Sequence, residues 1–162
     1  MAAAKKDKES SGFREVRNSK ASHKYFIGQK FEAGIALKGT EVKSIRAGKG
    51  QISEAFVRVE GGNAILYHAY IDEYAFGTDS QHNPTRPRRL LLHKKEIKKL
   101  QAGVETGGET IIPTRMYLAH GLIKLEIALC KGKKLFDKRE DLKRKTANRE
   151  TERVLKDRTR SR

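Results

Sequence analysis

The sequence has few of the residues that support disulfide frameworks or membrane segments. Its 162 residues include one cysteine, Cys130, three prolines and no tryptophan. One thiol cannot form an internal disulfide and is typical of a reducing compartment, so we expect a cytoplasmic protein. No apolar run reaches the roughly 18 residues that a membrane-spanning helix needs, and residues 1–9 lack the apolar stretch of a signal peptide. We therefore expect neither membrane insertion nor secretion.

Recognisable catalytic and metal-binding patterns are also lacking. The histidines fall in separate segments without a His-Glu-x-x-His spacing, at His23, His68, His82, His93 and His120. The sequence Gly48-Lys49-Gly50 does not make a phosphate-binding loop, because Lys43 stands where the first glycine should be and neither Ser nor Thr follows Lys49. The sequence therefore predicts no enzyme, no metal site and no cofactor. A nuclease on the same fold would need clustered carboxylates, which the sequence does not offer.

Positive charge is concentrated at the two ends of the chain. The formal net charge is +16. Residues 1–24 hold seven Lys and Arg against three Asp and Glu, and residues 131–162 hold fourteen against six, whereas the centre is nearly balanced. Basic ends on a balanced centre are typical of a protein that binds a polyanion. Nucleic acid is the simplest such partner, and an anionic membrane surface is the alternative.

The stretch Glu32–Gly50 predicts a strand, a turn and a short helix in direct succession. Apolar residues alternate from residue 33 to residue 37, which is the period of a half-buried strand. Thr40 is a suitable N-cap, and Gly48 suits the left-handed residue that closes a helix. Glu32 falls on the strand face opposite the apolar residues. It is either a solvated glutamate or a residue that meets a partner.

Further alternating segments predict a mainly β fold. They cover residues 55–59 and 65–71, on either side of a Gly61-Gly62-Asn63 turn signal, and residues 111–118 and 122–130, on either side of His120-Gly121. Gly28 predicts a bulge or bend, and Pro113 an edge or a bulge. The core-facing residues expected on the second segment are Ile65, Tyr67, Ala69 and Ile71. A small OB-like antiparallel β-barrel with two or three short helices fits this pattern, and an open antiparallel sheet with helices on one face is the alternative.

Two segments between the strands are predicted to be a loop and a helix. Residues 76–89 read as a loop whose prolines hold three cations, Arg86, Arg88 and Arg89, away from the core. The helix is expected over residues 93–102, with Gly103 ending it.

The two ends of the chain have the composition of segments that do not pack. Residues 1–17 are too polar to bury and are predicted to be a disordered basic arm, which leaves residues 18–131 as the barrel. Residues 132–162 form a basic C-terminal tail with good helix formers but no continuous apolar face. We expect this tail to be disordered when free and helical when a polyanion neutralises it. A solvated tail without a defined role is the alternative.

Four segments together resemble the SsrA-binding protein (small protein B) family, whose members are partners of transfer-messenger RNA (tmRNA) in bacterial trans-translation. They are Asn18-x-Lys20-Ala21-x-His23-x-Tyr25-Phe26-Ile27, Glu32–Lys49, Leu90-Leu91-Leu92-His93-Lys94 and Lys131-Gly132-Lys133-Lys134-x-Phe136-Asp137-Lys138-Arg139. The segments follow the family's order over residues 18–142. Any one of them alone would be a weak signal, but the four together are specific.

The resemblance implies an adaptor that acts in ribosome rescue. An OB-like barrel would bind the tRNA-like domain of tmRNA. Together with elongation factor Tu, which holds the charged tmRNA, the complex would enter the empty A site of a stalled ribosome and contact the decoding centre and mRNA channel of the small subunit. The protein would be a monomer without a cofactor. A ribosomal or initiation-factor-like OB-fold protein is the alternative.

The resemblance also implies roles for individual residues. Glu32, Leu91 and His93 correspond to positions that grip the RNA, although His93 stands where other members have asparagine. The predicted RNA-binding set further includes Asn18, Lys20, His23, Tyr25, Lys38 and Lys124. The segment implied to enter the decoding centre and mRNA channel comprises Gly132, Lys133, Lys134, Phe136, Asp137, Lys138 and Arg139. Phe136 replaces the histidine or tyrosine of some relatives and keeps a planar ring for stacking.

Overall fold

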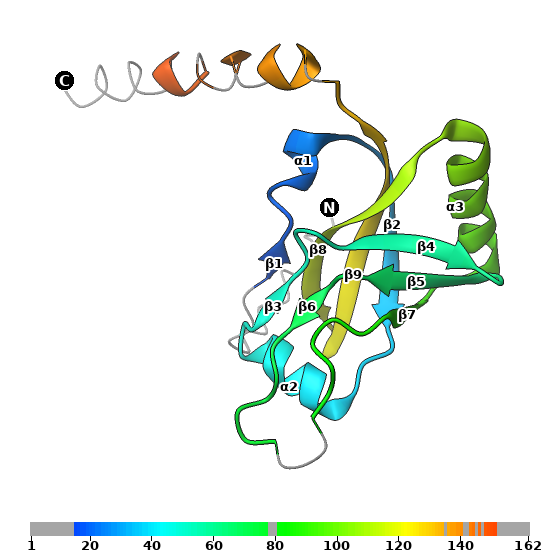
Figure 1. Ribbon diagram of the computed structural model, residues 1–162, viewed down its shortest axis with the longest axis vertical. Helices are drawn as coiled ribbons and strands as arrows, with labels where there is room; N and C mark the ends of the chain where they lie inside the picture. Colours follow the sequence, from blue (N-terminus) through cyan, green and yellow to red (C-terminus); the bar gives the residue numbers. More distant parts are fainter. Residues whose placement is uncertain are drawn as a thin grey trace, which may run out of the picture.

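Six antiparallel strands close a small β-barrel in the part of the chain that the structure describes (Figure 1). The computed structural model describes residues 15–77, 81–134, 136–140, 143–144, 146 and 148–151. The strands are β1 (Val16–Arg17), β2 (Tyr25–Ile35), β3 (Gly50–Gln51), β4 (Phe56–Glu60), β5 (Asn63–Tyr67), β6 (Tyr70–Ile71), β7 (Arg88–Leu91), β8 (Thr110–Ala119) and β9 (Leu122–Gly132). The barrel runs β8-β4-β5-β7-β2-β9, and β9 pairs with β8 again to close it. This confirms the predicted mainly β fold with an OB-like antiparallel barrel.

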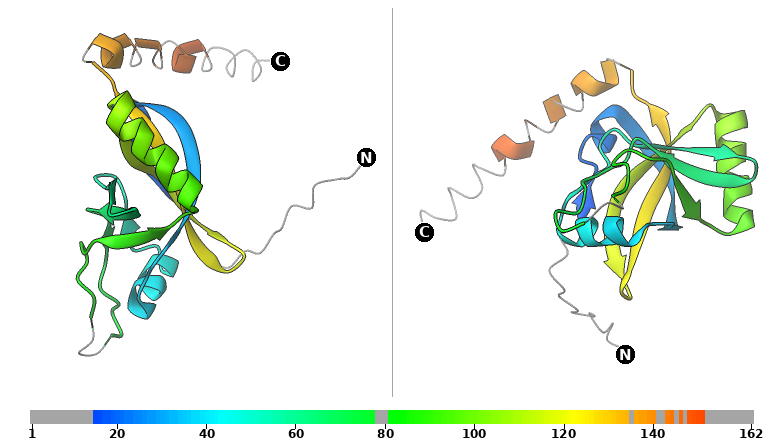
Figure 2. Two further views of the ribbon diagram at one scale, coloured as in Figure 1. Left: turned by 90° about the vertical axis from the view of Figure 1, so that its right-hand side faces the viewer. Right: turned by 60° about the horizontal axis from the view of Figure 1, so that its bottom comes forward.

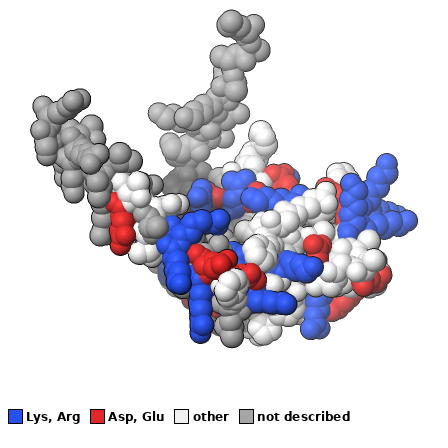
Figure 3. Space-filling model, turned by 90° about the horizontal axis from the view of Figure 1, so that it is seen from above, with Lys and Arg blue, Asp and Glu red and all other residues white. Residues whose placement is uncertain are grey.

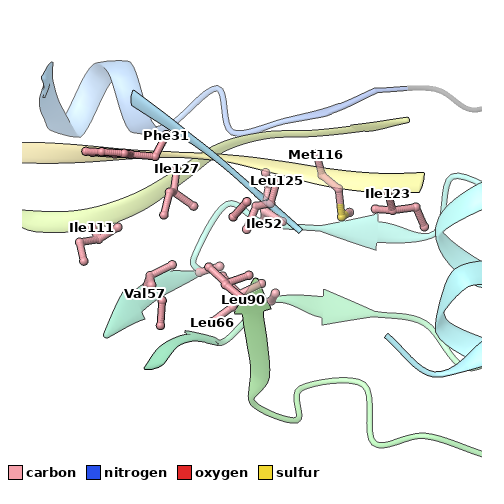
Figure 4. Packing of buried hydrophobic residues seen from close by; sticks show 14 of the residues in the cluster. Phe31, Ile52, Val57, Leu66, Leu90, Ile111, Met116, Ile123, Leu125 and Ile127 are labelled. Atoms are coloured by element: carbon pink, nitrogen blue, oxygen red, sulfur yellow. The ribbon is translucent and has the colours of Figure 1, made fainter. Parts of the chain in front are cut away.

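The core consists of the inward side chains of the barrel strands. Strand β9 shows the predicted alternation: Ile123, Leu125, Ile127 and Leu129 are buried. Side chains of the opposite strands meet them inside the barrel, including Val57, Leu66 and Leu90 (Figure 4). Because side chains alternate along a strand, this arrangement leaves every second residue of β2, β8 and β9 on the outer face.

Both of the longest antiparallel pairings contain the irregularities that the sequence predicted. The register between β2 and β9 shifts between Ile27 and Lys30, next to Gly28. The register between β8 and β9 shifts between Pro113 and Arg115. Such bulges increase the local twist and bend the strand, which helps a narrow sheet to close on itself.

Three helices flank the barrel: α1 (Ala21–Lys24), α2 (Gly39–Arg46) and α3 (Lys94–Gly107). Helices α1 and α2 lie at opposite ends of β2, and α3 packs against β4, β8 and β9 (Figures 1 and 2). The N-cap of α2 is Lys38 rather than the predicted Thr40. The prediction that Gly103 ends α3 was wrong, since the helix continues to Gly107 and Gly108 closes it with a φ of 59°.

The hairpin between β4 and β5 forms as predicted, but part of its face assignment was wrong. Gly61 and Gly62 have φ values of 54° and 72°, as the tight turn requires. The inward residues of β5 are Ala64 and Leu66, not Ile65 and Tyr67. His68 has a φ of 56°, and this left-handed residue reverses the alternation of inward and outward side chains. Ala69 and Ile71 are therefore buried as expected.

The prediction that Arg86 and Arg88 are held away from the core was also wrong. The Arg88 side chain is completely buried beside the buried carboxylate of Glu41, at 2.9 Å. Arg86 reaches the same carboxylate through two hydrogen bonds, of 2.8 Å and 2.5 Å. A fourth hydrogen bond comes from the backbone N–H of Lys38, at 2.7 Å. Four hydrogen bonds satisfy the accepting capacity of a carboxylate, which allows the charge to be buried.

The boundaries of the barrel differ slightly from the predicted ones. Val16 and Arg17, predicted to belong to the arm, pair with β8, whose edge can satisfy their backbone groups. Gly132, assigned to the tail, is the last residue of β9. Residues 1–14 of the predicted arm lie outside the described residues. Residues 136–140, 143–144, 146 and 148–151 are helical, and these helical pieces of the tail extend away from the barrel from the end that carries α1 (Figures 1 and 2).

Within the described part of the chain, no helix is long and apolar enough to span a bilayer.

Candidate nucleic-acid interface

The outer surface of β7, β2, β9 and β8 carries two aligned rows of residues, which we call the two-row face. In the first row, strand register places Tyr117, Lys124, Gly34 and Leu91 side by side across four strands. In the second row it places Arg115, Glu126 and Glu32 side by side across three strands. The register thus brings together Glu32, Leu91 and Lys124, three of the residues predicted to bind RNA.

Glu32 is held by two partners within the two-row face. The Tyr117 hydroxyl donates a hydrogen bond to Glu32 Oε2, and Lys124 Nζ lies 3.2 Å from Glu32 Oε1. The hydrogen bonds from Tyr117 and Lys124 lower the pKa of Glu32. Burial, followed by the bond to Glu32, raises the pKa of Tyr117 to about 12. At neutral pH the carboxylate is therefore ionised and the phenol remains a donor.

Glu126 lies directly opposite Glu32 and has its own set of partners. It accepts from Thr114 Oγ1 at 2.7 Å and pairs with Lys30 at 3.1 Å and Arg115 at 3.0 Å. Burial would raise the pKa of Glu126, but these three contacts outweigh it and leave the pKa lowered. Like charges in directly opposite positions destabilise a sheet, so the surrounding cations allow both carboxylates to remain ionised.

The two-row face can therefore make more than one kind of contact with a polyanion. Lys30, Lys124 and Arg115 supply positive charge, while Glu32 and Glu126 supply acceptors, which gives a small positive excess. Phosphates can be met only by the cations and other donors. The acceptors are suited to base N–H groups and ribose hydroxyls, the groups through which proteins recognise folded RNA.

Leu91 and His93 lie at the β7 side of the two-row face. Leu91 is 55% exposed and covers Gly34. A Cβ at Gly34 would lie 3.2 Å from Leu91 Cβ, so glycine permits this close approach. His93 is the exposed N-cap of α3, and its backbone N–H donates to Glu96 at 2.8 Å. Lys38 lies just beyond the same end of β2.

The other predicted RNA-binding residues lie around α1, at the opposite end of β2. Asn18 is buried: its side-chain amide donates to the carbonyls of Ile52 at 3.2 Å and Pro113 at 3.0 Å, and its Oδ1 accepts from Ala21. This amide therefore anchors the start of α1 to the barrel.

Exposed and half-buried side chains surround this anchor. Lys20 pairs with Glu54 at 2.8 Å, while His23 and Tyr25 are half-buried. Tyr25 and Glu32 are separated by about 20 Å at the usual rise of a strand. The predicted set therefore divides into two groups, one at each end of β2.

The predicted ribosome-contacting segment begins beside α1. Lys133 donates its backbone N–H to Lys24 O at 3.0 Å and its Nζ to Ser22 O at 2.8 Å. The carboxylate of Asp137 accepts the backbone N–H of Lys134 at 3.0 Å, which is the N3-to-N-cap contact of a helix start. Phe136 is 68% exposed. The first turn of the tail helix is thus defined by contacts within the segment itself.

Charge on the surface around this end is mixed rather than of one sign. Viewed from above, Lys and Arg side chains are spread over the described surface with acidic side chains between them (Figure 3). Among the described residues, no group of His, Cys, Asp or Glu is placed to hold a metal ion.

Tyr117 and Arg115 were missed by the sequence analysis. Their signal was present, because a two-residue turn at His120-Gly121 fixes the register of the hairpin and places Tyr117 opposite Lys124. The guanidinium of Arg115 lies 4.7 Å from the centre of the Tyr117 ring, within the range of a cation–π contact.

Comparison with known proteins gives consistent matches over most of the chain. A family model described as SmpB protein matches residues 15–157. The SsrA-binding protein of Shouchella clausii is 52% identical over 145 residues, which cover 90% of this chain and 93% of that protein. The SsrA-binding protein of Geobacter sulfurreducens is 46% identical over 144 residues, covering 89% and 94%.

One solved structure is similar in both sequence and fold. It is described as "tmRNA-SmpB: a journey to the center of the bacterial ribosome". Its matching chain is 42% identical, with a TM-score of 0.65, and the match covers 79% of this chain and 94% of that one.

Proposed function

Because the chain belongs to the SmpB family, we propose that it binds the tRNA-like domain of tmRNA and delivers this RNA to the A site of stalled ribosomes. The observation that carries the proposal is the two-row face, where an exposed leucine, a fixed carboxylate and a lysine lie together on a rigid barrel. Shape-specific contacts of this kind suit a folded RNA that presents unpaired bases.

The tail has a separate part in the proposed function. Residues from Gly132 to Arg139 enter the decoding centre and mRNA channel of the small ribosomal subunit, and Phe136 supplies an exposed ring for stacking. Elongation factor Tu joins the complex through the charged tmRNA. The protein acts in the cytoplasm as a monomeric adaptor and not as an enzyme.

The RNA that co-purifies with the protein tests the proposal directly. Sequencing should find one dominant RNA with a tRNA-like end. Ribosomal RNA alone would contradict the proposal and favour a ribosomal or initiation-factor-like protein.

Truncation after Lys131 tests the division between the barrel and the tail. The truncated protein should bind tmRNA with nearly full affinity, because Glu32, Leu91 and His93 remain, but tagging of nascent chains on stalled ribosomes should disappear. Full-length Glu32→Ala is the matched control, with weakened RNA binding and an intact tail. Loss of tmRNA binding on truncation would contradict this division.

A further inference from the structure

Tyr117 contacts a residue two strands away on the outer face of the barrel. It belongs to β8, whereas its hydrogen-bond partner Glu32 belongs to β2, on the far side of β9. Neighbouring strands lie about 4.8 Å apart, so the Tyr117 and Glu32 side chains together span roughly 10 Å of sheet.

The two partners of Glu32 use only part of its accepting capacity. Tyr117 donates to Oε2 and Lys124 approaches Oε1, so each oxygen has one contact. A carboxylate has about four lone-pair sites. The Glu32 side chain is 53% exposed. The carboxylate is therefore fixed in orientation but retains accepting capacity toward solvent, in contrast to the fully satisfied Glu41.

The chemistry of a fixed, exposed carboxylate limits what it can recognise in RNA. It accepts hydrogen bonds and repels phosphate, so its partners are base N–H groups or ribose 2′-hydroxyls. A mobile glutamate would lose side-chain entropy on meeting such a donor. Fixing the carboxylate in advance avoids that cost at binding.

We propose that Tyr117 is a positioning residue for RNA recognition, which fixes the Glu32 carboxylate so that its remaining lone pairs meet N–H or O–H donors of the RNA. The inference rests on the proposed function, because it assumes that tmRNA is the RNA that meets the two-row face. Tyr117 acts through Glu32, and its ring also carries the contact with Arg115.

The test is a double-mutant cycle with Tyr117→Phe and Glu32→Ala, using the full chain and a transcript of the tRNA-like domain of tmRNA. Tyr117→Phe removes only the hydroxyl and should weaken binding by about tenfold, because the freed Glu32 side chain must then lose its rotamer entropy on binding. The double variant should bind no more weakly than Glu32→Ala alone, because Tyr117 has no role without its partner. The melting temperature of each variant is measured in parallel.

Tyr67→Phe is the matched control for loss of a phenol. The Tyr67 hydroxyl donates to Glu60 at 3.0 Å on the β4–β5 hairpin, away from the two-row face. This variant should bind the transcript like the wild type. A Tyr117→Phe variant with wild-type affinity, or effects of Tyr117→Phe and Glu32→Ala that add, would overturn the inference. A wild-type protein that fails to bind the transcript would instead overturn the proposed function.

Discussion

Glu32 and Glu41 are two carboxylates in neighbouring elements, β2 and α2, with opposite environments. Glu41 is completely buried and accepts four hydrogen bonds, from Arg86, Arg88 and the backbone of Lys38. Glu32 is half-exposed and has one contact on each oxygen. The first carboxylate is fully used by the protein, whereas the second is oriented by the protein and still available to a partner.

This difference separates the structural charge of Glu41 from the proposed binding charge of Glu32. Both glutamates lie beside cations, and both have a lowered pKa. Removing a partner from a buried ion pair leaves an uncompensated charge in the core, while removing an exposed pair costs little stability. The Glu41 cluster should therefore affect folding, and the two-row face should affect RNA binding.

The largest expected effect is that of Arg88→Ala. Arg88 also donates to the carbonyls of Ala69 at 2.6 Å and Pro84 at 2.8 Å, so the substitution leaves several buried acceptors unsatisfied as well as Glu41. We expect the free energy of unfolding to fall by about 3–5 kcal/mol, measured by urea denaturation. The exposed neighbour Arg89 is the control, and Arg89→Ala should change it by less than about 0.5 kcal/mol. Equal urea midpoints for the two variants would contradict the structural role of the cluster.

Glu32→Ala should weaken RNA binding and leave stability nearly unchanged. Its affinity for the tRNA-like domain should fall by about tenfold or more, because one charged acceptor is lost, while the free energy of unfolding changes by less than about 1 kcal/mol. Filter binding and thermal unfolding measure the two quantities. Glu60→Ala, which removes the partner of Tyr67, should leave RNA binding unchanged. A large drop in melting temperature with intact RNA binding would reverse the comparison and make Glu32 the structural residue.

The smallest effect concerns the dependence of stability on pH. Burial alone would raise the pKa of Glu41, but the bonds from Arg86 and Lys38 and the charge of Arg88 leave it below its ordinary value of 4.5. A lowered pKa in the folded state contributes stability above the unfolded value, and this contribution is lost as the pH falls through the folded value. Wild-type stability should therefore decline below about pH 4.5, and Glu32→Gln should retain most of this decline. Urea midpoints at neutral and acidic pH measure this decline in stability. If Glu32→Gln abolished the decline, the exposed carboxylate of Glu32 would be its cause.

The fold could be predicted where local patterns agree with the barrel. The alternation of β9 and the turn signals at Gly61-Gly62 and His120-Gly121 were each sufficient to place an element. Predictions were wrong where contacts between residues far apart in the sequence determine the local structure. Gly103 reads as a helix stop, but a Cβ there would lie 2.8 Å from Leu129, so glycine allows α3 to pack closely on β9.

Which side chains of β5 face the core could not be predicted either. A single left-handed residue, His68, reverses the alternation of inward and outward side chains within an otherwise regular segment. Arg86 and Arg88 were predicted to lie away from the core because their partner is also distant in the sequence. Nothing local to Arg88 shows that Glu41, far away in the sequence, will bury with it.

The candidate site was predicted in part. Glu32 and Leu91 were named from the family resemblance and Lys124 belonged to the wider predicted set, and strand register places all three on one face. The role of Asn18 as an internal anchor could not be seen, because its partners Ile52 and Pro113 become neighbours only in the fold. The position of Tyr117 opposite Lys124 could have been predicted from the register of its hairpin. Its bond to Glu32 could not, because that bond depends on β2 lying next to β9.

Strand β2 fixes the distance between the two-row face and the start of the tail. Its Glu32 end belongs to the two-row face, and at its other end Tyr25 pairs with Gly132, where the tail begins. Pairing with β9 along both halves keeps the separation of these ends constant, apart from the bend at Gly28. In the proposed function, the RNA-binding site at one end and the tail at the other are therefore set a fixed distance apart. Lengthening that distance by roughly 7 Å would take matching two-residue insertions in both β2 and β9.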